Sequence, residues 1–347
     1  MLKNTRVLKP VLFLIAAWLM VSLACSSSSE GTTRPDDQNA GPDAAAKTNT
    51  PRVTKTATTA PTATVAPIGM GRENPYPLDG IPSLPNWDVQ VLEIVRGEAA
   101  WTAIRAANMF NEPALEGMEY ILLKLYAKSN YTDSDAHQIG SCDFSVTGDL
   151  LILYTCFASW VVEPDPQFDA ELFTGGETEG WAAYMIGKGE GNLMLVFDES
   201  WSTESDAVRY IALDVGASIS ISPDLYDIAP TDLGISRSMP APLGETVINQ
   251  DWEISVLEVI RGEPAWSMAL AANQFNDPPL EGMEYIAVRV HARYIGTGEI
   301  SADIEGYSFS STGSAGVLYD NPSVVEPEPS LSATLFPGGE CEGWVFV

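Results

Sequence analysis

The sequence predicts an all-β protein built from two tandem antiparallel β-sandwiches, and three observations support this. One stretch of sequence occurs twice, most segments alternate apolar and polar residues, and Gly, Pro, Asn and Asp punctuate the chain at hairpin spacing. Residues 87–128 align without gaps to residues 252–293, and 23 of the 42 pairs are identical. Such a match at a fixed offset indicates two copies of one domain.

Strand patterns recur within each copy. From Ile121 to Ala127 every second residue is apolar, and Lys124 and Tyr126 lie between them. The matching residues 286–293 alternate in the same way. This period of two is typical of a strand with one face in a core and the other in water. Further strands are expected over residues 87–95, 142–147, 150–157, 169–173, 180–186, 192–198 and 208–221.

One short helix is expected after the first strand of each copy. Residues 100–109 and 265–274 are rich in alanine, with larger apolar residues at helical spacing. Pro264 suits a first helical turn, and Pro113 blocks continuation after the end. About seven to nine short strands with one small helix favour a sandwich of immunoglobulin-like type, with a β-barrel as the weaker alternative.

The match between the copies sets the domain boundaries. We expect an immunoglobulin-like domain over residues 76–222 (the first repeat), a linker over 223–244 and a second domain over 245–347 (the second repeat). The second repeat has no counterpart of residues 185–222. A sandwich without those strands would expose edges and apolar surface. We therefore expect a C-terminally truncated second domain, either as a fragment of a longer chain, which we favour, or by natural loss.

The charge of the chain excludes nucleic acid as a partner. The 347 residues include 18 basic and 47 acidic side chains, for a formal charge of −29. Of these, 11 basic and 43 acidic residues follow residue 70, so the excess belongs to the later part of the chain. Binding to phosphates requires a basic footprint, and this chain would be repelled.

The first 24 residues have the pattern of a lipoprotein signal peptide. Lys3, Arg6 and Lys9 precede an apolar run that is too short for a membrane span of about 20 residues. The run ends in Ser22-Leu23-Ala24-Cys25, which resembles a bacterial lipobox, although Ser22 stands where leucine is preferred. The resemblance implies a diacylglyceryl group, with two acyl chains such as palmitate, on the thiol of Cys25, which becomes the mature N-terminus. The alternative is ordinary secretion with an incidental Cys25.

Residues 25–75 are expected to form a disordered tether. Residues 26–70 are rich in Ser, Thr and Pro and contain no aromatic residue. Such a segment cannot bury enough apolar surface to offset its ordering entropy. At this length it has a reach of about 35–40 Å. We therefore expect an extracytoplasmic protein, anchored to the membrane by an N-terminal lipid.

Three cysteines follow Cys25. Cys142 and Cys156 flank a turn and have the same strand parity, so a disulfide between them is plausible in an oxidising compartment. The second repeat has Tyr307 and about Asn321 at these positions, so the fold does not depend on the bridge, and buried free thiols are the alternative. Cys341 has no repeat-equivalent partner.

Catalysis and a dedicated metal site are not expected. His137 and His291 are the only histidines, neither recurs in the other copy, and no nucleophile, zinc, P-loop or dinucleotide motif is present. Acidic residues at 133–135 and 198–206 lack EF-hand spacing, so only weak surface binding of Ca²⁺ is expected. We expect no cofactor and no enzymatic activity.

The loop after each helix and the unmatched tryptophans are the remaining candidate sites. In the first loop, we expect Phe110 and Leu115 to anchor into the core, with a ligand site at Glu116 and Glu119 as the alternative. Tryptophans that recur in both repeats are expected in the core, at positions 87, 101 and 181. Those without an equivalent are candidates for exposed rings that stack on a sugar or a partner, namely Trp160 and Trp201.

These motifs resemble a known family. The segments RGEAAW (96–101), AANMFNEPALEGMEYI (106–121) and GGETEGW (175–181), with their copies in the second repeat, resemble the telokin-like, immunoglobulin-like domains of bacterial surface lipoproteins, a family of unknown function. The resemblance implies a β-sandwich outside the cytoplasm and transfers no catalytic residue.

The sequence therefore favours a non-catalytic, membrane-anchored lipoprotein that presents tandem immunoglobulin-like modules for protein interaction or envelope organisation. A glycan-binding module that uses Trp160 or Trp201 is the alternative. A solute-binding lipoprotein is a third possibility, disfavoured because strands do not alternate with long helices.

Overall fold

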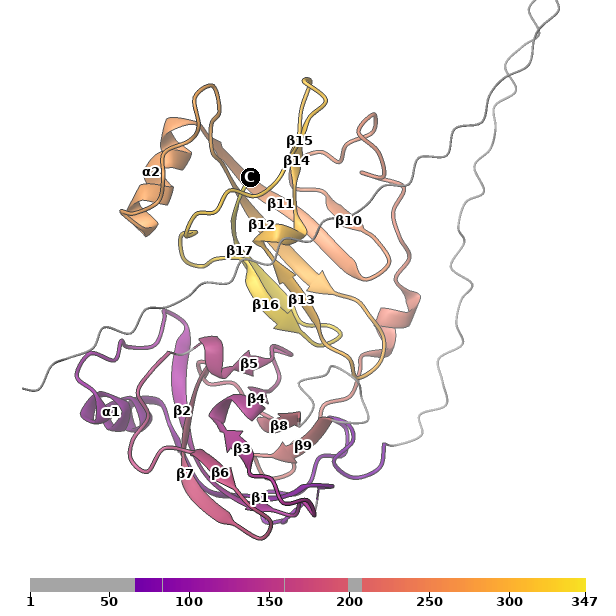
Figure 1. Cartoon of the computed structure of the whole chain (residues 1–347). Coiled ribbons are helices and arrows are strands. Elements are labelled where there is room, and N and C mark those ends of the chain that lie inside the picture. Colours follow the sequence, from indigo (N-terminus) through magenta and orange to yellow (C-terminus); the bar gives the residue numbers. More distant parts are fainter. Residues whose placement is uncertain (1–65, 83, 159, 199–207) are drawn as a thin grey trace, which may run out of the picture. The chain divides into compact units, whose positions relative to one another are not determined.

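The computed structural model describes residues 66–82, 84–158, 160–198 and 208–347 (Figure 1). This part of the chain consists mainly of β-strands in several antiparallel sheets, with two α-helices. The all-β prediction is confirmed at this level.

The first repeat has a three-stranded sheet with a long central strand. The strand β2 (Met118–Ser129) pairs with β1 (Trp87–Arg96) on one side and with β7 (Glu177–Gly187) on the other, both antiparallel. A β-bulge between Val91 and Glu93 shifts the register of the first pair. The alternation expected from residue 121 onwards places Ile121, Leu123 and Leu125 in a core where all three are fully buried.

A second sheet covers this core from the other side. Its strands are ordered β5 (Tyr154–Thr155), β4 (Phe144–Thr147), β8 (Met194–Asp198) and β9 (Val208–Ala212). Apolar side chains of both sheets meet in one cluster, so the first repeat is a two-layer sandwich. A small separate ladder joins β3 (His137–Gly140) to β6 (Asp169–Leu172). The 3-10 turns η1 (Ser141–Asp143), η2 (Cys156–Ala158) and η3 (Pro223–Asp227) connect or follow these strands.

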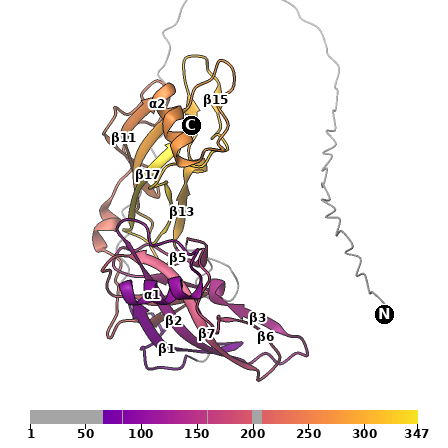
Figure 2. The same cartoon turned by 90° about the vertical axis from the view of Figure 1, so that its left-hand side faces the viewer.

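The helix α1 (Gly97–Ala107) lies on the outer face of the first sheet (Figure 2). Its buried residues Ala100 and Ile104 pack against Tyr120 and Leu122 of β2. The helix begins three residues earlier than expected. Gly97 adopts a positive φ of 61°, a conformation suited to glycine, and this lets the chain turn from strand into helix at once.

The second repeat has the same central arrangement. A sheet contains β10 (Thr246–Ile248), β11 (Trp252–Arg261), β12 (Ile286–Tyr294) and β17 (Glu340–Phe346), in that order. The helix α2 (Glu263–Ala272) lies against it, and its Pro264 occupies the first turn as expected. The shorter elements are β13 (Ala302–Glu305) with β16 (Ser332–Leu335), β14 (Ser311–Thr312) with β15 (Leu318–Tyr319), and the 3-10 turn η4 (Gly306–Ser308).

The two repeats hold one corner of the fold together by different means. In the first repeat a disulfide joins Cys142 of η1 to Cys156 of η2, with their Cα atoms 5.2 Å apart. In the second repeat the Asn321 side chain takes over the role of a cross-link. Its Nδ2 donates to the carbonyl oxygens of Gly306 at 2.6 Å and Phe346 at 3.1 Å.

Removal of the disulfide should destabilise the first repeat. For the double variant Cys142→Ser, Cys156→Ser we expect the free energy of unfolding to fall by about 3 kcal/mol, since the bridge closes a short loop that restricts the unfolded chain. Urea unfolding followed by tryptophan fluorescence measures the change. Cys341→Ala, which removes a free thiol, is the control. Equal stability of the double variant and the wild type would contradict the expectation.

Candidate interaction loops

Each repeat presents an exposed apolar loop between its helix and its central strand. The loops span residues 108–117 and 273–282 and are called the first and second apolar loop below. Phe110 is 81% exposed, and Phe275 at the same position of the second repeat is 82% exposed. Leu115 and Leu280 are 48% and 79% exposed.

The expectation that Phe110 and Leu115 anchor into the core is therefore wrong. The core between the helix and the central strand is instead filled by other residues, among them Ile104 of α1 and Tyr120 and Leu122 of β2. Two large aromatic residues at equivalent positions are thus left in solvent, and Met109 beside the first of them is 77% exposed as well.

An Asn turn begins each loop. Asn108 Oδ1 accepts a hydrogen bond from the backbone N–H of Phe110 at 3.0 Å. Asn273 Oδ1 accepts one from the N–H of Phe275, also at 3.0 Å. Asparagine side chains commonly support turns in this way, two residues along the chain. The backbone of each exposed phenylalanine is therefore held by its own loop.

A second asparagine ties each loop to a distant segment. Asn111 Nδ2 donates to the Ile104 carbonyl at 2.8 Å and to the Val162 carbonyl at 2.8 Å, and its Oδ1 accepts from the Val162 N–H at 2.9 Å. One side chain thus joins the end of the helix, the loop and the segment around residue 162. Both amide donors are satisfied, so rotation of the side chain would break several hydrogen bonds at once.

The second repeat reproduces this clamp. Asn276 Nδ2 donates to the Ala269 carbonyl at 2.7 Å and to the Val325 carbonyl at 2.9 Å, and its Oδ1 accepts from the Val325 N–H at 2.8 Å. Residues 276 and 325 are the sequence equivalents of 111 and 162. In both copies the loop is therefore held by an asparagine side chain that bonds to two backbone carbonyls and one backbone N–H at equivalent positions.

A tyrosine and an ion pair complete the support. The Tyr120 hydroxyl donates to the Glu112 carbonyl at 3.1 Å, and the Tyr285 hydroxyl donates to the Asp277 carbonyl at 2.9 Å. Burial raises the pKa of both hydroxyls, and the nearby carboxylates add to the effect. An arginine before the helix pairs with a glutamate after the loop in both repeats, as Arg96–Glu119 and Arg261–Glu284.

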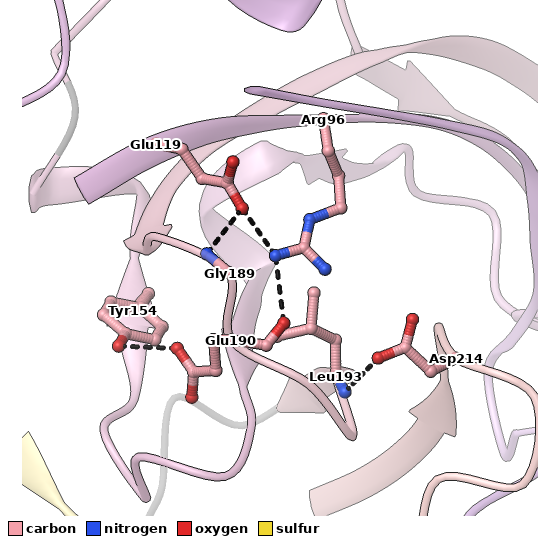
Figure 3. Close-up of polar contacts among 7 residues, drawn as sticks. All are labelled: Arg96, Glu119, Tyr154, Gly189, Glu190, Leu193 and Asp214. Atoms are coloured by element: carbon pink, nitrogen blue, oxygen red, sulfur yellow. Dashed lines mark hydrogen bonds and ion pairs between the residues drawn. The ribbon is translucent and has the colours of Figure 1, made fainter. Parts of the chain in front are cut away.

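In the first repeat the ion pair belongs to a larger polar network (Figure 3). Arg96 Nη2 lies 2.6 Å from Glu119 Oε1 and donates to the Glu190 carbonyl at 3.0 Å, while Glu119 Oε1 accepts the Gly189 N–H at 3.1 Å. Glu119 is therefore engaged in holding the chain around residue 190. The alternative expectation of a ligand site at Glu116 and Glu119 loses one of its two groups, and Glu116 is exposed on the loop.

The Glu190 side chain is the buried part of this network. It is 6% exposed and accepts hydrogen bonds from the Tyr154 hydroxyl at 2.8 Å and from the Leu150 N–H at 2.9 Å. Burial raises the pKa of Glu190, and the hydrogen bonds from Leu150 and Tyr154 oppose this rise. Burial and the neighbouring Glu190 raise the pKa of Tyr154. These contacts join the segment before β8, which contains Glu190, to the segment from Leu150 to Tyr154.

The tryptophan candidates differ in what the structure describes. Trp160 is 84% exposed, and its ring lies 5.8 Å from that of Phe157, which is 49% exposed. It precedes by two residues the valine that Asn111 holds, so the first apolar loop and Trp160 belong to one neighbourhood of the chain. Trp201 lies outside the described residues, as does the lipidation candidate Cys25.

The remaining candidate groups are engaged in local contacts. His137 stacks on Tyr131 with ring centroids 3.4 Å apart, and its Nε2 lies 2.9 Å from Asp133 Oδ1. His291 pairs with Glu340 at 3.3 Å. Burial raises the pKa of the free Cys341 thiol to about 12. In the part of the chain that the structure describes, no three His, Cys, Asp or Glu side chains are grouped so as to hold a metal ion.

The comparisons with known proteins leave the family open. No family model and no curated protein matches the chain. A candidate lipoprotein (ycdA) of Bacillus subtilis aligns with a TM-score of 0.30 and 13% identity over 39% of this chain and 38% of its own. The yjhA protein of Bacillus subtilis aligns with a TM-score of 0.24 and 10% identity over 40% of this chain and 99% of its own. Both TM-scores are below 0.5, so neither likeness establishes a shared fold.

The chain thus spans well under half of the Bacillus subtilis ycdA chain that it matches. Across the described ranges, neither helix has the length and apolar character needed to cross a bilayer.

Acidification should remove the cost of burying the ionised Glu190 carboxylate in the folded state. Because burial raises its folded pKa above the ordinary value of 4.5, the ionised carboxylate disfavours folding above the folded pKa, and this effect disappears as the pH falls towards 4.5. We expect the stability of the wild type relative to Glu190→Gln to rise from pH 7 to about pH 4.

Urea unfolding at each pH measures this difference. The variant Tyr154→Phe removes a hydrogen-bond donor that lowers the Glu190 pKa, so the pKa of Glu190 should be higher in this variant. The difference in stability between Tyr154→Phe and the double variant Tyr154→Phe, Glu190→Gln should therefore begin to change at a higher pH than the difference between wild type and Glu190→Gln. A difference between wild type and Glu190→Gln that stays constant over this range would contradict the account.

Proposed function

We propose that the protein is a membrane-anchored extracytoplasmic lipoprotein that uses two immunoglobulin-like modules, without catalysis, to bind another protein of the cell envelope. The anchor is supported by the lipobox-like sequence that ends at Cys25 and by the Ser-, Thr- and Pro-rich segment after it. The binding role is supported by the two apolar loops.

The observation that carries the proposal is that both loops expose phenylalanine on a backbone held by the same hydrogen bonds. Exposed aromatic side chains are enriched at protein interfaces, because they bury much apolar surface at little cost in side-chain entropy. A backbone that is already ordered loses little further entropy on binding. The clamps made by Asn111 and Asn276 provide that order.

Two loops on one chain also favour binding to a partner that offers two sites. The second contact then forms within one complex, at an effective concentration set by the connection between the modules. Weak individual contacts of Phe110 and Phe275 could in this way give firm attachment. The proposal that the protein is not an enzyme rests on the same residues, since the loops present apolar side chains and use their polar groups to hold the backbone.

A glycan-binding module is the second candidate, and the 84% exposure of Trp160 favours it. An exposed indole beside Phe157 offers an apolar face on which a sugar ring could stack. This function would need only the first repeat, because the second has no equivalent tryptophan.

Photo-crosslinking in the native envelope tests the main proposal. A photoreactive phenylalanine analogue is placed at position 110 or 275 of the full chain, with positions 215 and 235, where exposed Val215 and Ile235 lie outside the loops, as controls. We expect one discrete protein adduct at both loop positions, and a loss of the adduct at 110 when Phe275→Ser weakens the second contact.

The same adducts at the control positions, or none at the loops, would overturn the proposal. Release of the adduct by free sugar, together with its loss in Trp160→Ala, would favour the glycan-binding candidate instead.

A further inference from the structure

A groove lies beside the second apolar loop in the second repeat. It has a volume of about 910 Å³ and lies between residues 305–310 and residues 320–326, with Leu331 and Ser332 also in its lining. Asn276, the clamp residue, forms part of the wall. This space is called the second-repeat groove below.

The groove lies where the two copies differ in sequence. The disulfide partners Cys142 and Cys156 of the first repeat correspond to Tyr307 and Asn321, which both line the groove. Without the disulfide, the Tyr307 ring is 81% exposed. The departure from the first repeat therefore places an aromatic ring at the mouth of an open space.

The lining of the groove is acidic. It includes Glu305, Asp320 and Glu326, and no Lys, Arg or His is among its residues. The Tyr307 hydroxyl is hydrogen-bonded to Glu305, and both Glu305 and Glu326 raise its pKa. The Glu326 carboxyl is half-buried against Gly306 and accepts the Phe346 N–H at 3.3 Å, and burial raises its pKa. A positive charge placed here would be stabilised by all three groups.

The lining also contains apolar side chains and adjoins the loop. Val324 and Val325 form part of the wall, and Val325 is 51% exposed. The backbone of Val325 is also the segment that Asn276 holds. The groove and the second apolar loop therefore share one rigid element, and a partner bound to Phe275 would lie close to the mouth of the groove.

We infer that the second-repeat groove binds a cationic segment of the partner protein, with a Lys or Arg side chain over the Tyr307 ring and near Glu305 and Glu326, and with apolar side chains against Val325. This inference rests on the proposed function, since it assigns the chemistry of the partner at that interface. Cations are attracted to aromatic faces and to paired carboxylates. Charge complementarity with a chain so rich in carboxylates also favours a basic partner over an anionic membrane.

Fluorescence anisotropy with two labelled peptides tests the inference. One peptide alternates lysine and valine, and the other alternates glutamate and valine, so the two share their apolar residues. The full chain is held in nanodiscs of zwitterionic lipid, which do not themselves attract the lysine peptide. We expect binding of the lysine peptide alone, with an affinity that falls as NaCl is raised from about 50 to about 200 mM.

Two groove variants and one matched control locate the site. Tyr307→Ser and Glu326→Gln should each weaken binding of the lysine peptide about tenfold. The control is Glu163→Gln, because Glu163 is the counterpart of Glu326 in the first repeat and is likewise a partly buried carboxylate that accepts a backbone N–H. It should leave the affinity unchanged. Thermal unfolding of each variant confirms that the second repeat stays folded.

Equal weakening by the control would show attraction to net charge alone, and binding of the glutamate peptide would show an apolar surface without charge selection; either result overturns the inference. If the groove variants bind the lysine peptide as the wild type does while crosslinks at positions 110 and 275 persist, the inference falls and the proposed function stands. If the wild-type chain binds the lysine peptide but gives no crosslinks at positions 110 and 275, the proposed function is contradicted instead.

Discussion

The burial of both faces of the central strand is the constraint on which each repeat depends. In β2, Ile121 and Leu123 face the sandwich core, while Tyr120 and Leu122 face the helix. A shift of this strand by one residue would exchange its two sets of side chains, so the packing on both faces sets its register. The strand therefore fixes where the helix lies. The loop that joins the helix to the strand runs over the surface, where its apolar side chains are exposed to solvent.

That crossing explains how an exposed loop can also be rigid. The phenylalanine of each loop faces solvent, while the asparagine side chains of the loop form hydrogen bonds to the backbone. Asn111 and Asn276 make equivalent hydrogen bonds to segments 51 and 49 residues away, at Val162 and Val325. Each loop is thus tied to the sandwich at its middle as well as at its ends, which is the order that a binding surface needs before it meets a partner.

Much of the fold could be predicted from the sequence, because repetition and a period of two are local patterns. The helix after the first strand followed from alanine-rich spacing, although its start at Gly97 depends on a positive φ that the spacing does not show. The exposure of Phe110 could not be predicted, since it depends on which side chains, such as Ile104 and Tyr120, fill the core between helix and strand. The signal in the sequence is the presence of that phenylalanine in both copies, and it is equally compatible with packing in a core. The groove beside Tyr307 is lined by residues from several segments of the second repeat, so it appears only in three dimensions.

The order of the two loops is the central claim, and NMR relaxation of their backbone amides tests it most directly. The amides of Phe110 and Phe275 both donate to asparagine side chains at 3.0 Å. The account predicts order parameters of about 0.85 for both, equal to those of the strands β2 and β12. Values below about 0.6, typical of a flexible backbone, would contradict it, because the loops would then be mobile connections with exposed apolar residues.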